Sequence, residues 1–450
     1  MSTSIAPSSF ALTQRSDVMR RSVFISAALA WCLVGPVAGQ TPSSAPAAVN
    51  PTGDVSLRDA LSLSLVQSPE LLSFDAGRRA AEARPLQTRY LPNPVLNATL
   101  EDLGPSGAVS DRADVLQPQT TVQLSQLVEL GGKRAARQRL AGLERDLATW
   151  DYEAARLDVL TRVSAAFLDV LGGQQAVAQA AQALGVAEQV RQTVAARVAA
   201  GVVSPIEETR ANVLVANAQI DTDRARQILD AHRRQLVTHW GSTTATFTSA
   251  TGDLEGLPVV PPLTALEAAL RRNPDLARWV AEVEQRQAAL ALARSTRVPD
   301  VTISAGYRRF TSVDANAVVV GASVPLPWFD RNRGGIQAAE AAVDQAHHAA
   351  RAAELNLVAR LAEAYGALAS AQGDLTTLRS RVVPGARAVF DAVREGYELG
   401  RFGLMDVLDA QRTLVDANGR YLQALTTFHR AVITVERLAG PLADAAPGSK

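Results

Sequence analysis

The longest regular pattern in the chain covers residues 133–200, where apolar side chains recur every three or four positions and no proline intervenes. This spacing is typical of helices that pack along a continuous seam. It starts with Leu140, Leu143, Leu147, Trp150, Ala154 and Leu157. A second run, richer in alanine, covers 335–399. The pattern therefore predicts two very long helices, the first about 100 Å long at 1.5 Å per residue.

Four shorter stretches predict strands, at 94–102, 119–127, 299–309 and 317–326. In the clearest of them, Val301, Ile303, Ala305 and Tyr307 alternate with Thr302, Ser304, Gly306 and Arg308. Such alternation indicates a strand whose two faces meet different surroundings. Four strands are too few to close a barrel. They form either a small sheet of a soluble protein or a part that several subunits pool.

The chain contains an internal repeat. Four landmarks recur in the same order about 200 residues later: Pro69 as Pro274, Pro92 as Pro299, Gly131 as Gly334, and Gly201 as Gly400. We predict a first structural repeat at 55–250, a linker at 251–262 and a second repeat at 263–440. Each repeat reads as a helix, two strands, a long helix and a hairpin helix. Residues 441–450 are a C-terminal tail.

The turns that follow the two long helices have clear signals. Gly201 and Gly400 suit the left-handed residue that ends a helix. In the first turn, Ser204 is placed to cap the next helix, with Glu207 completing a capping box. In the second turn, Asp406 occupies the place of Glu207.

The first 39 residues read as a secretion signal. A short basic segment precedes an apolar stretch and small residues before Gln40. Met19 directly precedes the arginine pair and is an alternative start. Cys32 is the single cysteine; we expect ordinary cleavage, with lipid attachment to Cys32 as the alternative. Residues 40–54 form a linker, and no later apolar run is long enough for a membrane-spanning helix.

Composition excludes several classes of function. The net charge is zero, with 45 basic and 45 acidic residues, so nucleic acid is not an expected partner. A mature chain without cysteine has neither disulfides nor thiolate metal sites. We find no catalytic or phosphate-binding motif, so we predict no enzyme activity and no cofactor. Adjacent residues point in different directions on a helix, so we assign no metal site to His347 and His348.

The repeated prolines, the paired strands and the two turns "RVAAGVVSPIEETRAN" and "YELGRFGLMDVLDAQ" resemble the TolC family of outer-membrane factors. The stretches "QLVELGGKRAAR" and "PLPWFDRNRGGI" resemble its heavy-metal branch. The resemblance implies a mainly α fold with a β-barrel portion. Long coiled-coil-like helical hairpins and four strands per subunit would assemble as a homotrimer, with a 12-stranded barrel in the outer membrane and a helical tunnel in the periplasm.

The resemblance also implies roles for individual residues. The strand-to-helix junctions would lie at Gly131, Gly132, Gly334 and Gly335. The hairpin tips would contact a periplasmic adaptor protein through Gly201, Ser204, Gly400 and Gly403. The pore entrance would be formed by Asp406, Asp409, Glu207, Tyr397 and Arg401. The family's latch arginine falls at Phe402, which departs from that pattern.

The function implied is that of a passive outer-membrane channel for divalent heavy-metal cations, working with the adaptor and an inner-membrane pump of the RND type. Two alternatives within the same class are a channel for drugs or other organic compounds and a type I secretion channel. An alternative of another class is a soluble periplasmic scaffold or adaptor built from coiled coils. Extraction with detergent and a heat-sensitive trimer would favour the channel.

Overall fold

The computed structural model describes residues 50–101, 118–311 and 314–442. The predicted signal at 1–39, Cys32, most of the 40–54 linker and most of the 441–450 tail lie outside the described residues.

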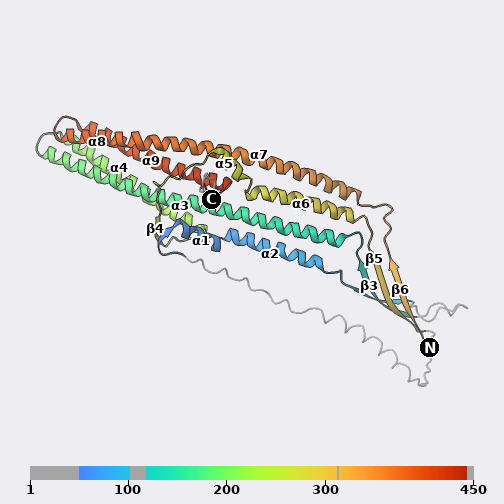
Figure 1. Cartoon of the computed structure of the whole chain (residues 1–450). Coiled ribbons are helices and arrows are strands. Elements are labelled where there is room, and N and C mark those ends of the chain that lie inside the picture. The colour runs from blue at the N-terminus through green and yellow to red at the C-terminus, as the bar shows by residue number, and fades with distance from the viewer. Residues whose placement is uncertain (1–49, 102–117, 312–313, 443–450) are drawn as a thin grey trace, which may run out of the picture. The chain divides into compact units, whose positions relative to one another are not determined.

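Helices make up most of the described chain and run lengthwise beside one another (Figure 1). The long helix α3 contacts α2, α4 and α6, and α7 contacts α6 and α9. None of the described helices is long and apolar enough to cross a membrane. The helices are α1 (Leu57–Gln67), α2 (Pro69–Arg89), α3 (Lys133–Ala199), α4 (Pro205–Thr238), α5 (Leu263–Leu270), α6 (Pro274–Ser295), α7 (Arg333–Thr377), α8 (Val383–Glu398) and α9 (Leu404–Ala439).

The predicted long helical run over 335–399 is confirmed to residue 398, but it is not α-helical throughout. A π-helical turn, Leu378–Val382, separates α7 from α8. Pro384 follows at the start of α8. Proline has no N–H for the helical ladder and its ring clashes with the carbonyl four residues earlier. A wider turn just before it absorbs that clash.

The four predicted strands are confirmed and form one antiparallel sheet in the order β2-β3-β5-β6. The sheet lies at one end of the helices, and the hairpin turns lie at the other end (Figure 1). Its strands are β2 (Val95–Glu101), β3 (Gln119–Val128), β5 (Val301–Phe310) and β6 (Ala315–Ser323). A second sheet, which the sequence did not predict, pairs β1 (Gly53–Ser56) with β4 (Phe247–Thr251) in parallel.

The register gives the four-stranded sheet one mostly apolar face and one mostly polar face. Residues opposite one another on paired strands share a face, so each face can be followed across the sheet. The apolar face carries Leu96, Leu100, Val122, Leu124, Ile303, Tyr307, Val318 and Val320, all of them exposed. The other face carries Asn97, Thr99, Thr121, Gln123, Ser125, Ser304 and Arg308.

Within the described part of the chain, three apolar clusters hold the helices together. One surrounds Trp240, where α1, α3 and α4 meet the small parallel sheet. Another surrounds Phe428 between α5, α7 and α9. The third, near the hairpin turns, contains Phe390 and Tyr397 of α8 packed against α3, α4 and α9.

Ion pairs add fixed contacts between α3 and the second half of the chain. Asp151 accepts from Arg278 of α6 at 2.6 Å. Asp158 accepts from Arg437 of α9 at 2.7 Å. Asp169 pairs with Arg430 of α9. One side of α3 is therefore bound to two helices of the second repeat by charge as well as by packing.

Candidate functional site

The two helical turns at the end remote from the sheet have the conformation that the sequence predicts. Gly201 and Gly400 have φ angles of +71° and +74°, in the left-handed region that favours glycine. Ser204 accepts a hydrogen bond from the Ile206 amide at 3.4 Å. At the other turn Gly403 has no side chain to form a full capping box, but Asp406 supplies half of one by accepting from the Gly403 amide at 2.8 Å.

Glu207 does not close a capping box, so that prediction was wrong. Its carboxylate accepts instead from the hydroxyl of Tyr397 at 3.3 Å and thereby connects α4 with α8. Tyr397 is almost fully buried. Burial, with the nearby charge of Glu207, raises the pKa of Tyr397, so its hydroxyl stays protonated and able to donate at neutral pH.

The cation at this contact is Arg197, in the last turn of α3. Its guanidinium lies 4.5 Å from the centre of the Tyr397 ring and donates to the Tyr397 carbonyl. Arg197, Tyr397 and Glu207 thus join the two helical hairpins; we call them the Arg197 cluster. Sequence reasoning missed Arg197 because it lies 200 positions from Tyr397. Its one local signal is a basic residue in the last turn of α3.

Arg401, predicted to lie at the pore entrance, is exposed, and among the described residues it forms no ion pair. Only its backbone amide is engaged, donating to the Gly396 carbonyl at 2.8 Å. Phe402 packs its ring over Gly396, where any larger residue would collide with it. Arg401 and Phe402 therefore help to form the turn between α8 and α9. The role of Arg401 at a pore entrance stays a prediction.

We expect Arg197→Gln to loosen the joined hairpins. It removes a half-buried cation over an aromatic ring, an interaction worth up to about 2 kcal/mol, and a contact with a carbonyl. If these hairpins close a pore, cells with the variant should become more sensitive to large antibiotics that the outer membrane excludes. Arg210→Gln, an exposed arginine on α4, is the matched control. Equal sensitivity of the two variants would contradict the expectation.

Asp406 and Asp409 lie in the first turns of α9, and both are exposed. The Asp406 carboxylate caps its own helix, so its charge also has a local structural use. Asp409 shares no side-chain hydrogen bond with the described residues. Among those residues, no group of three or more His, Cys, Asp and Glu side chains is placed to hold a metal ion.

At the first strand-to-helix junction, the chain turns through two left-handed glycines, Gly131 and Gly132, at φ +69° and +72°. A Cβ at Gly131 would lie 2.7 Å from the Cβ of Val298, so the first glycine is also required by close packing. Next, Lys133 donates to Asp300 at 2.7 Å, and the Leu130 amide donates to the same oxygen at 3.0 Å. This carboxylate fastens the start of α3 to the start of β5.

The second junction, which lies beside Gly334 and Gly335, turns by a different device. The left-handed residue is Asn332, at φ +55°, whereas Gly334 and Gly335 already belong to α7. The side-chain amide of Asn332 donates to the Ala293 carbonyl at 2.9 Å. A side chain at Gly335 would collide with Asn332. The second glycine therefore leaves room for the asparagine that makes the turn.

We expect the contribution of Lys133 to stability to vanish in acid. Burial opposes ionisation of Asp300, but hydrogen bonds from Lys133 and the Leu130 amide outweigh it and keep the pKa of Asp300 below its usual value. The contribution is present above the unfolded pKa, about 4, and is lost as pH falls through the folded value. Thermal unfolding of Lys133→Met should start lower than wild type at pH 7, with the gap closing well below pH 4. A gap independent of pH would contradict this assignment.

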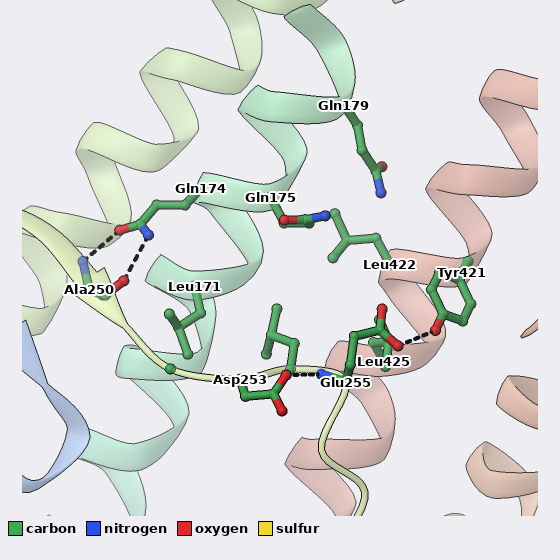
Figure 2. A pocket seen from close by; sticks show the side chains of 12 residues that line it. Leu171, Gln174, Gln175, Gln179, Ala250, Asp253, Glu255, Tyr421, Leu422 and Leu425 are labelled. Atoms are coloured by element: carbon green, nitrogen blue, oxygen red, sulfur yellow. Dashed lines mark hydrogen bonds between the residues drawn. The ribbon is translucent and has the colours of Figure 1, made fainter. Parts of the chain in front are cut away.

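A cavity of about 240 Å³ lies between α3, α9 and the connection after β4. Its polar side chains hold β4 and that connection in place (Figure 2). Gln174 donates to the Ala250 carbonyl at 2.9 Å and accepts from its amide at 2.7 Å. Tyr421 donates to Glu255 at 2.6 Å, and burial, with this hydrogen bond, raises the pKa of Tyr421 to about 12. The cavity is therefore a site where the connection docks.

Comparison with known proteins identifies relatives over most of the chain. The family model described as outer membrane efflux protein matches residues 60–242 and 265–441. The cobalt-zinc-cadmium resistance protein CzcC of Cupriavidus metallidurans is 35% identical over 388 residues, which cover 86% of this chain and 90% of that protein. The nickel-cobalt-cadmium resistance protein NccC of Alcaligenes xylosoxydans is 28% identical, covering 67% of this chain and 69% of its own.

Solved structures share the fold. A membrane protein from Pseudomonas aeruginosa aligns with a TM-score of 0.73 at 20% identity, covering 88% of this chain and 93% of its own. CusC, whose structures describe the formation of a transmembrane channel, aligns with a TM-score of 0.71 at 15% identity, covering 89% of this chain and 98% of that chain. The family match spans both halves of the chain, and the protein belongs to the outer membrane efflux protein family.

Proposed function

We propose that this protein is the outer-membrane subunit of a tripartite complex that exports divalent heavy-metal cations. Three copies would pool their strands into one 12-stranded barrel, and their helices would extend into the periplasm as a tunnel. A periplasmic adaptor would contact the hairpin tips, and an inner-membrane RND pump would supply the energy. Transport through this subunit itself would be passive.

The observation that carries the proposal is the four-stranded sheet. Its apolar face is exposed, and β2 and β6 each pair with only one strand among those described. Open edges cannot exist in lipid, because every backbone polar group there needs a partner. Pairing β6 of one copy with β2 of the next removes the edges. Trp328 and Phe329 follow β6 and are 71% and 99% exposed. Exposed aromatic side chains of this kind are typical of the boundary between membrane and water.

Metal cargo is proposed from the relatives. CzcC and NccC are named for resistance to cobalt, zinc, cadmium and nickel. Carboxylates from three subunits around one entrance would attract such cations. Asp409 is the sharper probe of this idea, since Asp406 also caps its helix.

The proposal is tested by metal accumulation in a strain that lacks the gene. We expect intracellular cobalt, zinc and cadmium to rise severalfold and tolerance to fall, with both restored by the wild-type gene. Asp409→Asn should restore less than Asp221→Asn, which removes an exposed carboxylate from α4. Unchanged metal with increased retention of drugs or dyes would indicate an organic cargo. A protein that is monomeric and soluble without detergent would reject the channel.

A further inference from the structure

The mostly polar face of the four-stranded sheet carries two charged residues among the described strands. They are Glu101, the last residue of β2, and Arg308 of β5. The remaining positions on this face are neutral. If the sheet forms part of a barrel wall, its apolar face points toward lipid and this face points toward the enclosed pore. Both charges would then lie inside the pore.

Arg308 is held in place by side chains from two other strands. Its Nε donates to the hydroxyl of Thr121 on β3 at 3.0 Å. Its Nη2 reaches past β3 to a carboxylate oxygen of Glu101 at 3.9 Å. Thr121 is 5% exposed, so the contact that orients the guanidinium is fixed by a buried residue. The arginine is therefore positioned beside its counter-charge.

Arg308 lies toward the end of the sheet that is remote from the helices. It is the eighth residue of β5, which starts beside the helical part. At 3.4 Å per residue, it stands roughly 24 Å along the strand. The opposite residue on β6 is Ala317, and the next position on this face of β5 is Gly306, both of which leave space for the guanidinium.

We propose that three Arg308–Glu101 pairs form a charge-compensated ring near the outer end of the pore and that this compensation lets doubly charged cations leave. The inference rests on the proposed function, because the four strands of one copy enclose no pore. Three uncompensated arginines in a narrow, low-dielectric wall would oppose the exit of cations. Glu101 cancels that charge locally, while Thr121 orients the arginine.

The test is the reversal potential of the purified protein in planar lipid bilayers under a potassium chloride gradient. Glu101→Gln should lower the cation-to-anion permeability ratio by about threefold, and Arg308→Gln should raise it by a similar factor. The double variant should return toward wild type, because the two charges act as a pair. Arg309→Gln, on the opposite face beside Asp314, and Arg308→Lys, which keeps the charge, should match wild type.

Assembly is checked for each variant as a heat-sensitive trimer on gels. Conducting trimers whose permeability ratio is unchanged by Glu101→Gln would overturn the ring while leaving the channel intact. A shift as large in Arg309→Gln would overturn it as well. A wild-type protein that neither forms trimers nor conducts would overturn the proposed channel and, with it, the ring. If Arg308→Gln fails to assemble, the comparison of Glu101→Gln with Arg309→Gln still decides whether the charge-compensated ring exists.

Discussion

Replacing Gly306 by alanine is expected to remove most of the assembled protein from the outer membrane. A Cβ at this position would lie 2.6 Å from the Val122 carbonyl oxygen and 2.9 Å from the Gln123 Cα on β3. Both are backbone atoms of a paired strand, so no rotation of a side chain can relieve the collision. Overpacking of this kind costs about 1–3 kcal/mol. The cost would recur in each subunit of a trimer.

A second glycine of the same sheet provides the control. A Cβ at Gly321 would collide with the hydroxyl of Ser304, at 2.8 Å, which can rotate away, and would lie at an ordinary 3.9 Å from the Gln123 side chain. We expect Gly321→Ala to assemble nearly as well as wild type. The measurement is the amount of heat-sensitive trimer in outer-membrane extracts of cells that produce each protein at matched levels. Equal loss from both variants would show that the close approach of β5 to β3 is not the cause.

Arg437→Met is expected to give the largest loss of stability in the helical part. The arginine is 12% exposed and donates to Asp158 of α3 at 2.7 Å and to Asp275 of α6 at 3.1 Å. Methionine would fill similar space but leave two carboxylates together without their cation. Because both carboxylates keep some access to water, we expect a cost of about 3 kcal/mol, the lower end for a broken buried pair.

The measurement is thermal unfolding of the detergent-solubilised protein, followed by loss of the helical circular dichroism signal. Arg420→Met, an exposed arginine on the same helix, should unfold within about 0.5 kcal/mol of wild type. An Arg437→Met midpoint equal to that of Arg420→Met would mean that the two aspartates turn to solvent without loss. We expect the Arg437→Met variant to regain part of its lost stability in acid, because protonation of Asp158 and Asp275 removes the repulsion between them.

The fold was largely predictable because its signals are local and long. The seam of α3 repeats over many turns, and the alternation of β5 separates two faces within ten residues. The small parallel sheet was not predictable, because β1 and β4 are short and about 190 residues apart. Neither segment shows a pattern strong enough to identify its partner.

The candidate site was predicted only in part, for a physical reason that differs at each position. The glycines that end α3 and α8 have to adopt a positive φ, which the sequence indicates directly. Asn332 also adopts a positive φ, and its side-chain amide bonds to the Ala293 carbonyl. The glycine pair two residues later is the stronger sequence signal and directed attention away from it. Arg197 could not be assigned from sequence, since only packing of the two hairpins brings it to Tyr397.

The ion pair of the buried Lys133 with Asp300 gives the junction a built-in chemical reporter. The sequence contains one other lysine, Lys450. Lys133 is 8% exposed and its ammonium is occupied by Asp300, so amine-selective reagents should leave it unlabelled in the folded protein. Mass spectrometry of an acylated sample would then detect opening of this junction as modification of a single peptide. With one other lysine in the sequence, few other peptides could be modified.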